Sequence, residues 1–357
     1  MNSFYNYSLR ELEQNTKPKY IAKQLYNWAY KKYTTNYQDM TNISPKEISN
    51  LKEKYTLDTL SIADVKISLD KTTKFLFELK DKYIIESVAL LMAEKKKDKT
   101  GQKIIKSEQI TFCISTQVGC KMACSFCKTG EGGWSRDLSV GEIVAQVVRM
   151  KEYLKLSENK NVNIVYMGMG EPLDNFENLT KAMDIIADSY GLDIAHRRQT
   201  VSTSGLTPNI LKLGELDTGV QLAISLHAVC DSMRDELVPL NKAYNIQSII
   251  NAVKKFPVDT RKKILFEYLV IKDKNDNIND AKKLCDILQG INAKVNLIYF
   301  NPYPGSRYER PTDKSMEVFK LYINKKGIFC SIRKSKGLDI MAACGQLAGE
   351  KIDNPII

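Results

Sequence analysis

The chain has 357 residues, of which 43% are hydrophobic and 9% aromatic, and its 53 lysine and arginine residues against 42 aspartate and glutamate give a formal net charge of +11. This composition predicts a globular protein with a sizeable core and excludes a disordered chain. No apolar stretch approaches the length of a membrane span, and the N-terminus has no export signal. The eight cysteines are therefore expected to serve metals or catalysis in a reducing compartment, which places the protein in the cytoplasm.

Residues 1–60 are predicted to form a small basic helical module. Residues 17–33 contain five lysines, five aromatic rings and no acidic side chain. Ile21, Leu25 and Trp28 recur in that segment at helical spacing, so we predict that Trp28 packs into the core. The lysines and the outer tyrosines then remain available to RNA, a phosphate-rich partner that the net charge also favours.

Two predicted helices carry N-terminal capping signals. One begins at Ser44, where a proline follows and Glu47 completes a capping box. The other covers residues 141–154 and is introduced by Ser139 and Glu142 in the same arrangement.

Residues 61–106 are predicted to be a β-rich linker region. Strand-like runs cover residues 73–79 and 83–90, and the charged residues 95–106 indicate an exposed loop between domains. Glu86 lies in the second run, where the default position of a carboxylate is a solvated strand face. Patterning alone gives Glu86 no function.

Four cysteines fall within fifteen residues, at Cys113, Cys120, Cys124 and Cys127, and the last three have the spacing CxxxCxxC. A cubane 4Fe–4S cluster takes one thiolate per iron, so three cysteines leave one iron open to the amino and carboxylate groups of S-adenosylmethionine (SAM). A structural zinc site is the alternative. Its fourth ligand would be Cys113, which is predicted to lie in a strand, so the cluster is the stronger hypothesis.

From residue 107 to 340, strand-like and helix-like segments alternate as in a parallel βα repeat. The predicted strands cover residues 110–115, 162–167, 199–202, 220–226, 264–271, 295–300 and 328–333. Six such units predict an α/β fold with an open, partial (β/α)6 TIM-type barrel, followed by a C-terminal loop and tail over residues 341–357. In such a barrel the site lies at the carboxyl ends of the strands.

Small or polar residues follow these predicted strands. They are the cysteine loop after the first strand, Gly170 and Glu171 after the second, Ser202 at the third, Ser225, Leu226 and His227 at the fourth, and Asn301 after the sixth. Glycines let backbone approach a ligand closely, and Glu171 could accept from the ammonium of a bound methionine. Their shared placement predicts one binding site at this face.

Five stretches of the chain resemble the bacterial adenine carbon-2 RNA methyltransferases, a family of radical SAM enzymes. They are residues 113–127, 165–173, 224–228, 296–302 and 337–347, and they span nearly the whole chain. The resemblance implies methylation of an adenosine at the peptidyl transferase centre of 23S rRNA and of one in the anticodon loop of some tRNAs. It further implies a radical SAM barrel, an RNA-binding accessory domain in residues 1–60, a reducing partner such as flavodoxin, no membrane association and a monomeric chain.

The resemblance also implies roles for single residues. Cys344 would carry the methyl group, Glu86 would accept a proton, and Cys113 would release the product by forming a transient disulfide with Cys344. The cluster ligands would be Cys120, Cys124 and Cys127, and the SAM contacts would be Gly170, Glu171, Ser202, Ser225, Leu226, His227 and Asn301. Each turnover would use two SAM molecules, one to methylate Cys344 and one as the source of a radical.

Two alternative functions stay open. Related enzymes of the antibiotic-resistance type share this cysteine apparatus but methylate carbon 8 of the ribosomal adenosine. Pro172, where that group tends to carry alanine, favours carbon 2. The second alternative is a non-catalytic, metal-stabilised RNA-binding module, which suits the basic N-terminal helix but gives Cys344 no role.

Overall fold

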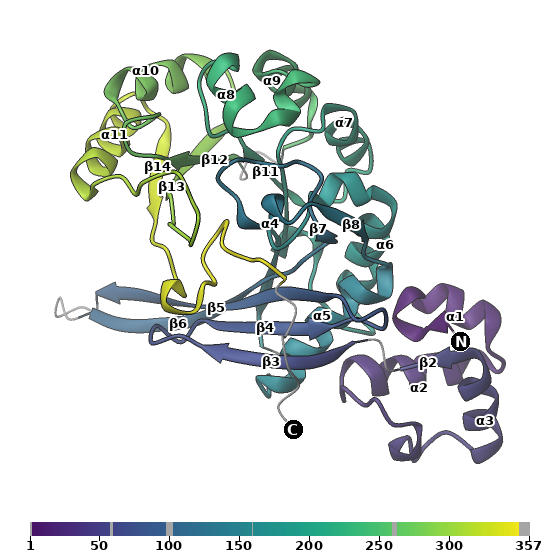
Figure 1. The fold of residues 1–357 in the computed structure, drawn as a ribbon. Helices are drawn as coiled ribbons and strands as arrows, with labels where there is room; N and C mark the ends of the chain where they lie inside the picture. Colours follow the sequence, from purple (N-terminus) through teal and green to yellow (C-terminus); the bar gives the residue numbers. More distant parts are fainter. Residues whose placement is uncertain (1, 58–59, 98–102, 159, 259–262, 350–357) are drawn as a thin grey trace.

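The computed structural model describes residues 2–57, 60–97, 103–158, 160–258 and 263–349. Within this part of the chain, ten strands form one sheet in the order β14-β13-β12-β11-β10-β9-β6-β5-β4-β3 (Figure 1). Seven neighbouring strands of the sheet are parallel: β6 (Lys103–Cys113), β9 (Val162–Tyr166), β10 (Gln199–Thr203), β11 (Gln221–Ser225), β12 (Ile264–Val270), β13 (Ala293–Tyr299) and β14 (Phe329–Arg333).

Helices follow the parallel strands and cover the outside of the curved sheet (Figure 1). They are α5 (Val140–Tyr153), α6 (Phe176–Ala187), α7 (Thr207–Glu215), α8 (Asp231–Leu237), α9 (Ile246–Lys255), α10 (Ile278–Ile287) and α11 (Asp313–Lys325). The predicted partial barrel is confirmed. The capping box before α5 is also confirmed, because the Glu142 amide donates to Ser139 Oγ at 3.3 Å and the Ser139 amide donates to the Glu142 carboxylate at 2.8 Å.

Three antiparallel strands continue the sheet beyond β6. They are β5 (Ile84–Lys97), β4 (Thr73–Glu78) and β3 (Ser61–Ile67). The loop predicted over residues 95–106 is therefore wrong at both ends, since Lys95 pairs with Ile105 and Lys97 with Lys103, while residues 98–102 lie outside the described ranges. Backbone pairing in a hairpin is insensitive to the charged side chains that suggested a loop.

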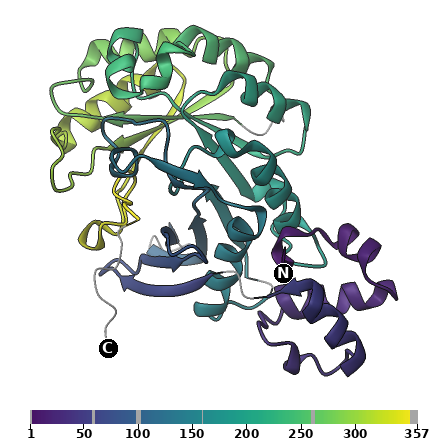
Figure 2. The ribbon, with the colours of Figure 1, turned by 45° about the vertical axis from the view of Figure 1, so that its right-hand side comes forward.

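The N-terminal residues form the predicted helical module, which packs beside α5 and α6 in both views (Figures 1 and 2). Its elements are β1 (Asn2–Ser3), α1 (Leu9–Asn15), α2 (Lys19–Tyr30), α3 (Pro45–Lys54) and β2 (Tyr55–Thr56). The Gly141 amide of α5 donates to Asn6 Oδ1 at 2.6 Å, and Lys181 of α6 pairs with Glu11 at 2.6 Å. Ser44 caps α3 by accepting from the Glu47 amide at 3.4 Å, which is one half of the expected capping box.

The aromatic residues of α2 are mostly core rather than RNA-facing. Tyr26 and Tyr30 are completely buried and their ring centroids lie 4.4 Å apart, so the expectation that the outer tyrosines face RNA is wrong for these two. Tyr20 does stay exposed, at 58%. Trp28 packs partly against the core, as predicted, and its Nε1 donates to Asn42 Oδ1 at 2.7 Å.

Shorter elements complete the fold. They are β7 (Gln117–Gly119), β8 (Trp134–Asp137), α4 (Lys128–Glu131) and the single helical turns η1 (Phe4–Asn6), η2 (Tyr37–Asp39), η3 (Pro172–Asn175), η4 (His196–Arg198), η5 (Pro239–Lys242) and η6 (Leu338–Ile340). No helix in the described ranges is long and apolar enough to cross a membrane.

Candidate active site

The carboxyl ends of the parallel strands surround a cavity of about 1110 Å³. Most of the site residues expected from sequence line it: Cys113, Cys120, Cys124, Cys127, Gly170, Glu171, Ser202, Ser225, His227, Asn301 and Cys344. Glu86 and Leu226 are not among the lining residues. The fold thus gathers segments that lie more than two hundred residues apart in sequence, while the ligand roles of these residues stay predictions.

The loop from Cys120 to Cys127 follows β7 and is fixed by backbone hydrogen bonds within it and to other segments, including one from the Ser125 amide to the Leu237 carbonyl at 3.1 Å. The Cys120 amide donates to the Gly133 carbonyl at 2.7 Å, and the Cys127 amide donates to the Cys124 carbonyl at 3.0 Å. Burial raises the pKa of Cys120 to about 12 and that of Cys124 well above its ordinary value, and the neighbouring thiolates add to both shifts. A bound cation reverses such shifts, because ligation deprotonates a thiol.

The three clustered thiols line one wall of the cavity and are free to bind a metal group. In the described ranges no three Cys, His, Asp or Glu side chains converge on one point, as ligands of one zinc ion at about 2.3 Å must. In a cubane, each thiolate binds an iron of its own, so the three sulfur atoms stand further apart. Three thiols on one cavity wall therefore fit a 4Fe–4S cluster.

Gly170 and Glu171 are held tightly at the end of β9. Gly170 has φ +102°, and a Cβ there would lie 2.6 Å from Gln117 Cβ, so only glycine fits. The buried Glu171 carboxylate accepts from the Ser204 amide and Ser204 Oγ, both at 2.8 Å, and from the Leu173 amide at 3.2 Å. Burial raises the pKa of Glu171, and these hydrogen bonds oppose that rise.

His227 is a neutral donor facing the cavity. Its Nδ1 accepts from the Leu269 amide at 3.0 Å, which fixes the hydrogen on Nε2. Burial lowers the pKa of His227 to about 3, so the ring stays uncharged at neutral pH. The Phe126 ring packs edge-on against it with centroids 4.9 Å apart.

A buried arginine ties the ends of β10 and β11 together. Arg234 Nε donates to the Leu226 carbonyl at 3.0 Å, and Nη2 donates to the carbonyls of Ser204 and Ser225, the latter at 3.2 Å. The Leu226 side chain itself is buried in the core and does not line the cavity. Ser202 Oγ lies 3.3 Å from Ser225 Oγ beside these hydrogen bonds. Sequence analysis missed Arg234 because it lies on a helix, α8, where charged residues are usually exposed.

Asn301 positions the segment that carries Cys344. Its Nδ2 donates to the Cys344 carbonyl at 3.3 Å, and its Oδ1 accepts from Ser335 Oγ at 2.6 Å and from Arg310 Nη1 at 3.1 Å. The Lys128 amide, just after the cysteine loop, donates to the Gly345 carbonyl at 2.8 Å. The methyl-carrier candidate is therefore anchored both to a strand end and to the cluster loop.

Cys113 and Cys344 share the cavity with an ion pair between the partly buried Arg333 and the buried Glu267. Burial raises the pKa of Cys113 to about 12 and that of Cys344 to about 11, and the charge of Arg333 opposes both shifts. Arg333 Nη1 lies 3.4 Å from Glu267 Oε1. Sequence analysis missed this pair, although a carboxylate inside the apolar strand β12 was a signal, since both faces of such a strand are covered.

Glu86 is buried at 1% exposure, so the expected solvated position is wrong. Its Oε2 lies 3.3 Å from Nζ of Lys74, which is also buried. Burial raises the pKa of Glu86, while the Lys74 charge and the amides of Gly349 and Ala348 oppose the rise. Sequence patterning could not find this pair, because the two residues meet diagonally across β4 and β5.

The strand of Glu86 leads directly to the cavity. Val88, two residues further on the same face of β5, lines the cavity and pairs with Cys113 of β6. Leu347, which also lines the cavity, precedes the two backbone amides that act on the Glu86 carboxylate. The C-terminal segment thus lies between Glu86 and the cavity.

Two family models match the chain. The radical SAM superfamily matches residues 114–285, and the ribosomal RNA large subunit methyltransferase N-terminal domain matches residues 8–57. The dual-specificity RNA methyltransferase RlmN of Aliarcobacter butzleri is 59% identical over 97% of this chain and 96% of its own length, and that of Nautilia profundicola is 53% identical over 98% of both. The chain belongs to the RlmN family.

A solved structure agrees with this assignment. A radical SAM methyltransferase from Sphaerobacter thermophilus is 37% identical, superposes with a TM-score of 0.89, and covers 98% of this chain and 100% of its own. As an RlmN-family protein, the chain is a radical SAM RNA methyltransferase, a class that uses SAM and a 4Fe–4S cluster. The non-catalytic binding module is thereby set aside. All eight cysteines are free thiols in the structure, so the Cys113–Cys344 disulfide stays a prediction.

Proposed function

We propose that this RlmN-family enzyme methylates carbon 2 of an adenosine in 23S rRNA and in the anticodon loop of some tRNAs, through a methyl group carried on Cys344. The observation that carries the proposal is that Cys344 and Cys113 line the same cavity as the three clustered cysteines. The names of the relatives, dual-specificity RNA methyltransferases, support two classes of RNA substrate.

The cluster would be held by Cys120, Cys124 and Cys127, with the predicted contacts at the strand ends holding SAM beside it. When bound there, the cluster and SAM would supply the one-electron chemistry that removes a hydrogen atom from the carrier methyl group. The neutral His227 offers an Nε2 hydrogen to this ligand, and the crowded Gly170 lets backbone approach it. Two SAM molecules serve each turnover, since one provides the methyl group and one the radical.

Cys344 acts in this proposal as a nucleophile and then as a carrier. Its thiolate attacks the methyl carbon of SAM, which forms the new sulfur–methyl bond and releases S-adenosylhomocysteine, and the nearby Arg333 favours this reaction by stabilising the thiolate. Asn301 holds the Cys344 backbone while this happens. After loss of a hydrogen atom, the carrier carbon adds to carbon 2 of adenine, which joins the protein to the RNA.

Release of the product requires a base and a second thiol. Glu86 would take the proton from carbon 2 once the adduct has passed one electron to an acceptor, a role that the bound 4Fe–4S cluster would supply. The Cys113 thiolate then attacks the Cys344 sulfur, the sulfur–carbon bond breaks, and the freed carbon is protonated to a methyl group as the disulfide forms. Glu86 reaches the base only when the segment containing Leu347 shifts, because that segment lies between them.

Nucleoside mass spectrometry after anaerobic incubation of both RNA types with reductant and SAM tests this function. The expected product is 2-methyladenosine. Cys344→Ala should abolish it, and Cys113→Ala should leave RNA covalently attached to the protein. The exposed Cys230 provides the matched control, since Cys230→Ala removes a thiol outside the cavity and should retain activity. Product at carbon 8, or full turnover without Cys344, would contradict the proposal.

We further infer that the protein acts as a cytoplasmic monomer and receives its electrons from a reducing protein such as flavodoxin. The basic surface supports an acidic redox partner as well as RNA. Activity with purified reduced flavodoxin, and a monomer mass by light scattering at working concentrations, are the expected results.

A further inference from the structure

Some residues that line the cavity are exposed to solvent, and none of the proposed chemical roles uses them. Of the described residues that line it, four are exposed: Asp70, Lys71, Met92 and Lys334. They come from the turn between β3 and β4, from β5, and from the segment after β14. We call these four residues the mouth. The remaining lining residues are buried or partly buried, so we expect a substrate group that reaches Cys344 from solvent to pass these four.

Two turns beside the mouth, residues 68–72 and 337–339, are joined by hydrogen bonds. Asp339, in η6, accepts from Ser68 Oγ at 2.5 Å and from the Leu69 amide at 3.1 Å. Asp70 accepts in return from the Gly337 amide at 3.1 Å, and from the Thr72 amide of its own turn at 2.9 Å. The carboxylates of Asp70 and Asp339 therefore both accept from backbone amides, and these hydrogen bonds hold the turn of residues 68–72 in place.

This turn presents an apolar side chain to solvent. Leu69 is 97% exposed, and Leu338 in the partner turn is 42% exposed. Met92 of the mouth is 46% exposed. A leucine so exposed adds nothing to the core, and in some nucleic-acid-binding proteins an apolar side chain inserts between neighbouring bases and unstacks them.

Two cations flank these apolar groups. Lys71 and Lys334 are exposed, and neither ammonium group forms an ion pair within the described part of the chain. Many other lysines of the surface do form such pairs, for example Lys82 with Glu78 at 2.7 Å and Lys272 with Glu309 at 2.6 Å. Unpaired lysines beside apolar groups match a phosphate backbone with splayed bases.

We propose that the mouth, together with Leu69, docks the single-stranded RNA segment that carries the target adenosine. Lys71 and Lys334 contact phosphates, while Leu69 and Met92 pack against bases next to the one that enters the cavity. The reason for single strands is geometric, because an adenine stacked in a duplex cannot reach a thiol inside the cavity. This inference rests on the proposed function, since it takes RNA as the substrate and Cys344 as the carrier.

The test compares RNA binding and methylation by the holoenzyme and its variants. Lys71→Ala with Lys334→Ala should weaken binding of a labelled anticodon stem-loop about 10-fold and reduce the slope of log affinity against log salt by about 1 to 2. Leu69→Ala should raise the KM for that RNA about 5- to 30-fold without changing the salt slope. Annealing a complementary strand over the loop should abolish methylation by the wild type and by Leu69→Ala alike.

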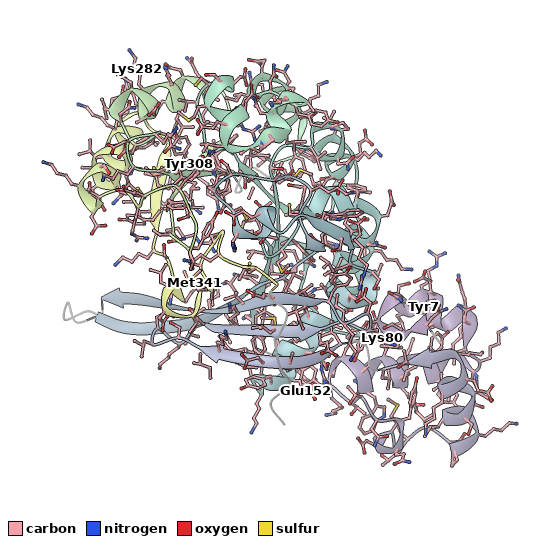
Figure 3. The ribbon with its side chains drawn as sticks, viewed as in Figure 1. Tyr7, Lys80, Glu152, Lys282, Tyr308 and Met341 are labelled. Carbon is pink, nitrogen blue, oxygen red and sulfur yellow. The ribbon has the colours of Figure 1, made fainter. Side chains whose placement is uncertain are left out.

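Matched controls lie elsewhere on the surface. Lys282, labelled in Figure 3 on α10, is far from Met341 in the segment before Cys344, so Lys282→Ala with Lys283→Ala removes the same charge away from the mouth. Leu321→Ala, on α11 and 61% exposed, removes an equivalent leucine. Both controls should bind and methylate RNA like the wild type. SAM-dependent methylation of Cys344, read from the mass of its peptide, should be unchanged in every variant.

The two proposals can fail separately. If the wild type forms 2-methyladenosine but the mouth variants match their controls in affinity, salt slope and KM, the docking inference is wrong and the proposed function stands. If the mouth variants lose RNA affinity as expected while the wild type makes another product, the docking surface stands and the assignment to carbon 2 fails.

Discussion

The protein contains two groups of functional cysteines that are assembled in opposite ways. Cys120, Cys124 and Cys127 occupy one loop, whose backbone is held by a local hydrogen bond between Cys127 and Cys124 and by further bonds to Gly133 and Leu237. Cys113 and Cys344 come from opposite ends of the barrel sequence and meet only because the strands bring them to one cavity. Local spacing therefore suffices to indicate the first group, whereas the second depends on the whole fold and on the contacts that fix the C-terminal loop.

Removal of one thiol from each group gives the largest expected effect. Cys124→Ala and Cys344→Ala should each lower RNA methylation by on the order of 10³-fold or more, since each removes an essential group. Their iron contents should differ, because Cys124→Ala loses a cluster ligand and Cys344→Ala does not. Iron and acid-labile sulfide are measured on anaerobically purified protein. Equal loss of iron in both variants would show that Cys344 also holds the cluster, and would contradict the division of the cysteines into two groups.

Glu86 should act together with the second group, Cys113 and Cys344, in release of the product. Glu86→Gln should slow release of the RNA adduct by about 10² to 10⁴-fold while Cys344 is still methylated. Because burial raises the pKa of Glu86, the release rate should fall on acidification at a higher pH than for a free glutamate. Lys74→Met removes a charge that lowers this pKa, so the acid limb should move to still higher pH. Single-turnover pH profiles measure both effects, and an unchanged limb in Lys74→Met would contradict the assigned base.

Substitution of Gly170 tests how strictly the backbone after β9 is constrained, as the cysteine loop is by its hydrogen bonds. Gly170→Ala should destabilise the fold by about 1–3 kcal/mol and weaken SAM binding, because the new Cβ meets Gln117 in a left-handed backbone. Gly290 also has a positive φ, +76°, but a Cβ there meets nothing within 4 Å. Gly290→Ala should therefore cost less and leave SAM binding unchanged. Urea unfolding and calorimetric titration with SAM measure the two effects. Gly290→Ala reports backbone strain alone, whereas Gly170→Ala adds the steric contact with Gln117.

The smallest effect is expected outside both groups. Ser44→Ala removes the cap of α3 and should cost about 1 kcal/mol of stability, with iron content and Cys344 methylation unchanged. Thermal unfolding measures the loss. A change in iron content would show that the N-terminal module and the cysteine loop are coupled.

Much of the fold could be predicted because parallel strands buried on both faces leave long apolar runs. The strand predicted over residues 264–271, for example, is observed as Ile264–Val270. Tyrosines were harder to place, because a polar tip suggests solvent, yet Tyr26 and Tyr30 pack among other rings of the module. Periodicity describes one segment at a time and does not report which rings from other segments complete a core.

The site was predictable where its residues are neighbours in sequence or at strand ends. Glu86 was not, because its neutralising partner Lys74 is brought near by the register of β4 and β5, in which Leu76 pairs with Glu86 and Lys74 with Val88. No local pattern encodes a diagonal contact between strands. Its expected role came only from the family resemblance, and the structure adds burial and a raised pKa.

The joined turns have a mechanical consequence for the barrel. The turn of residues 68–72 follows β3 at one edge of the sheet, and residues 337–339 follow β14 at the opposite edge, so the yellow C-terminal segment crosses between the two edges (Figure 1). The ring is completed by a few side-chain hydrogen bonds rather than by a ladder of paired strands. Such a junction depends on two aspartates, Asp70 and Asp339, rather than on backbone pairing between strands. Substitution of either side chain can therefore loosen the closure while every strand of the sheet keeps its partners.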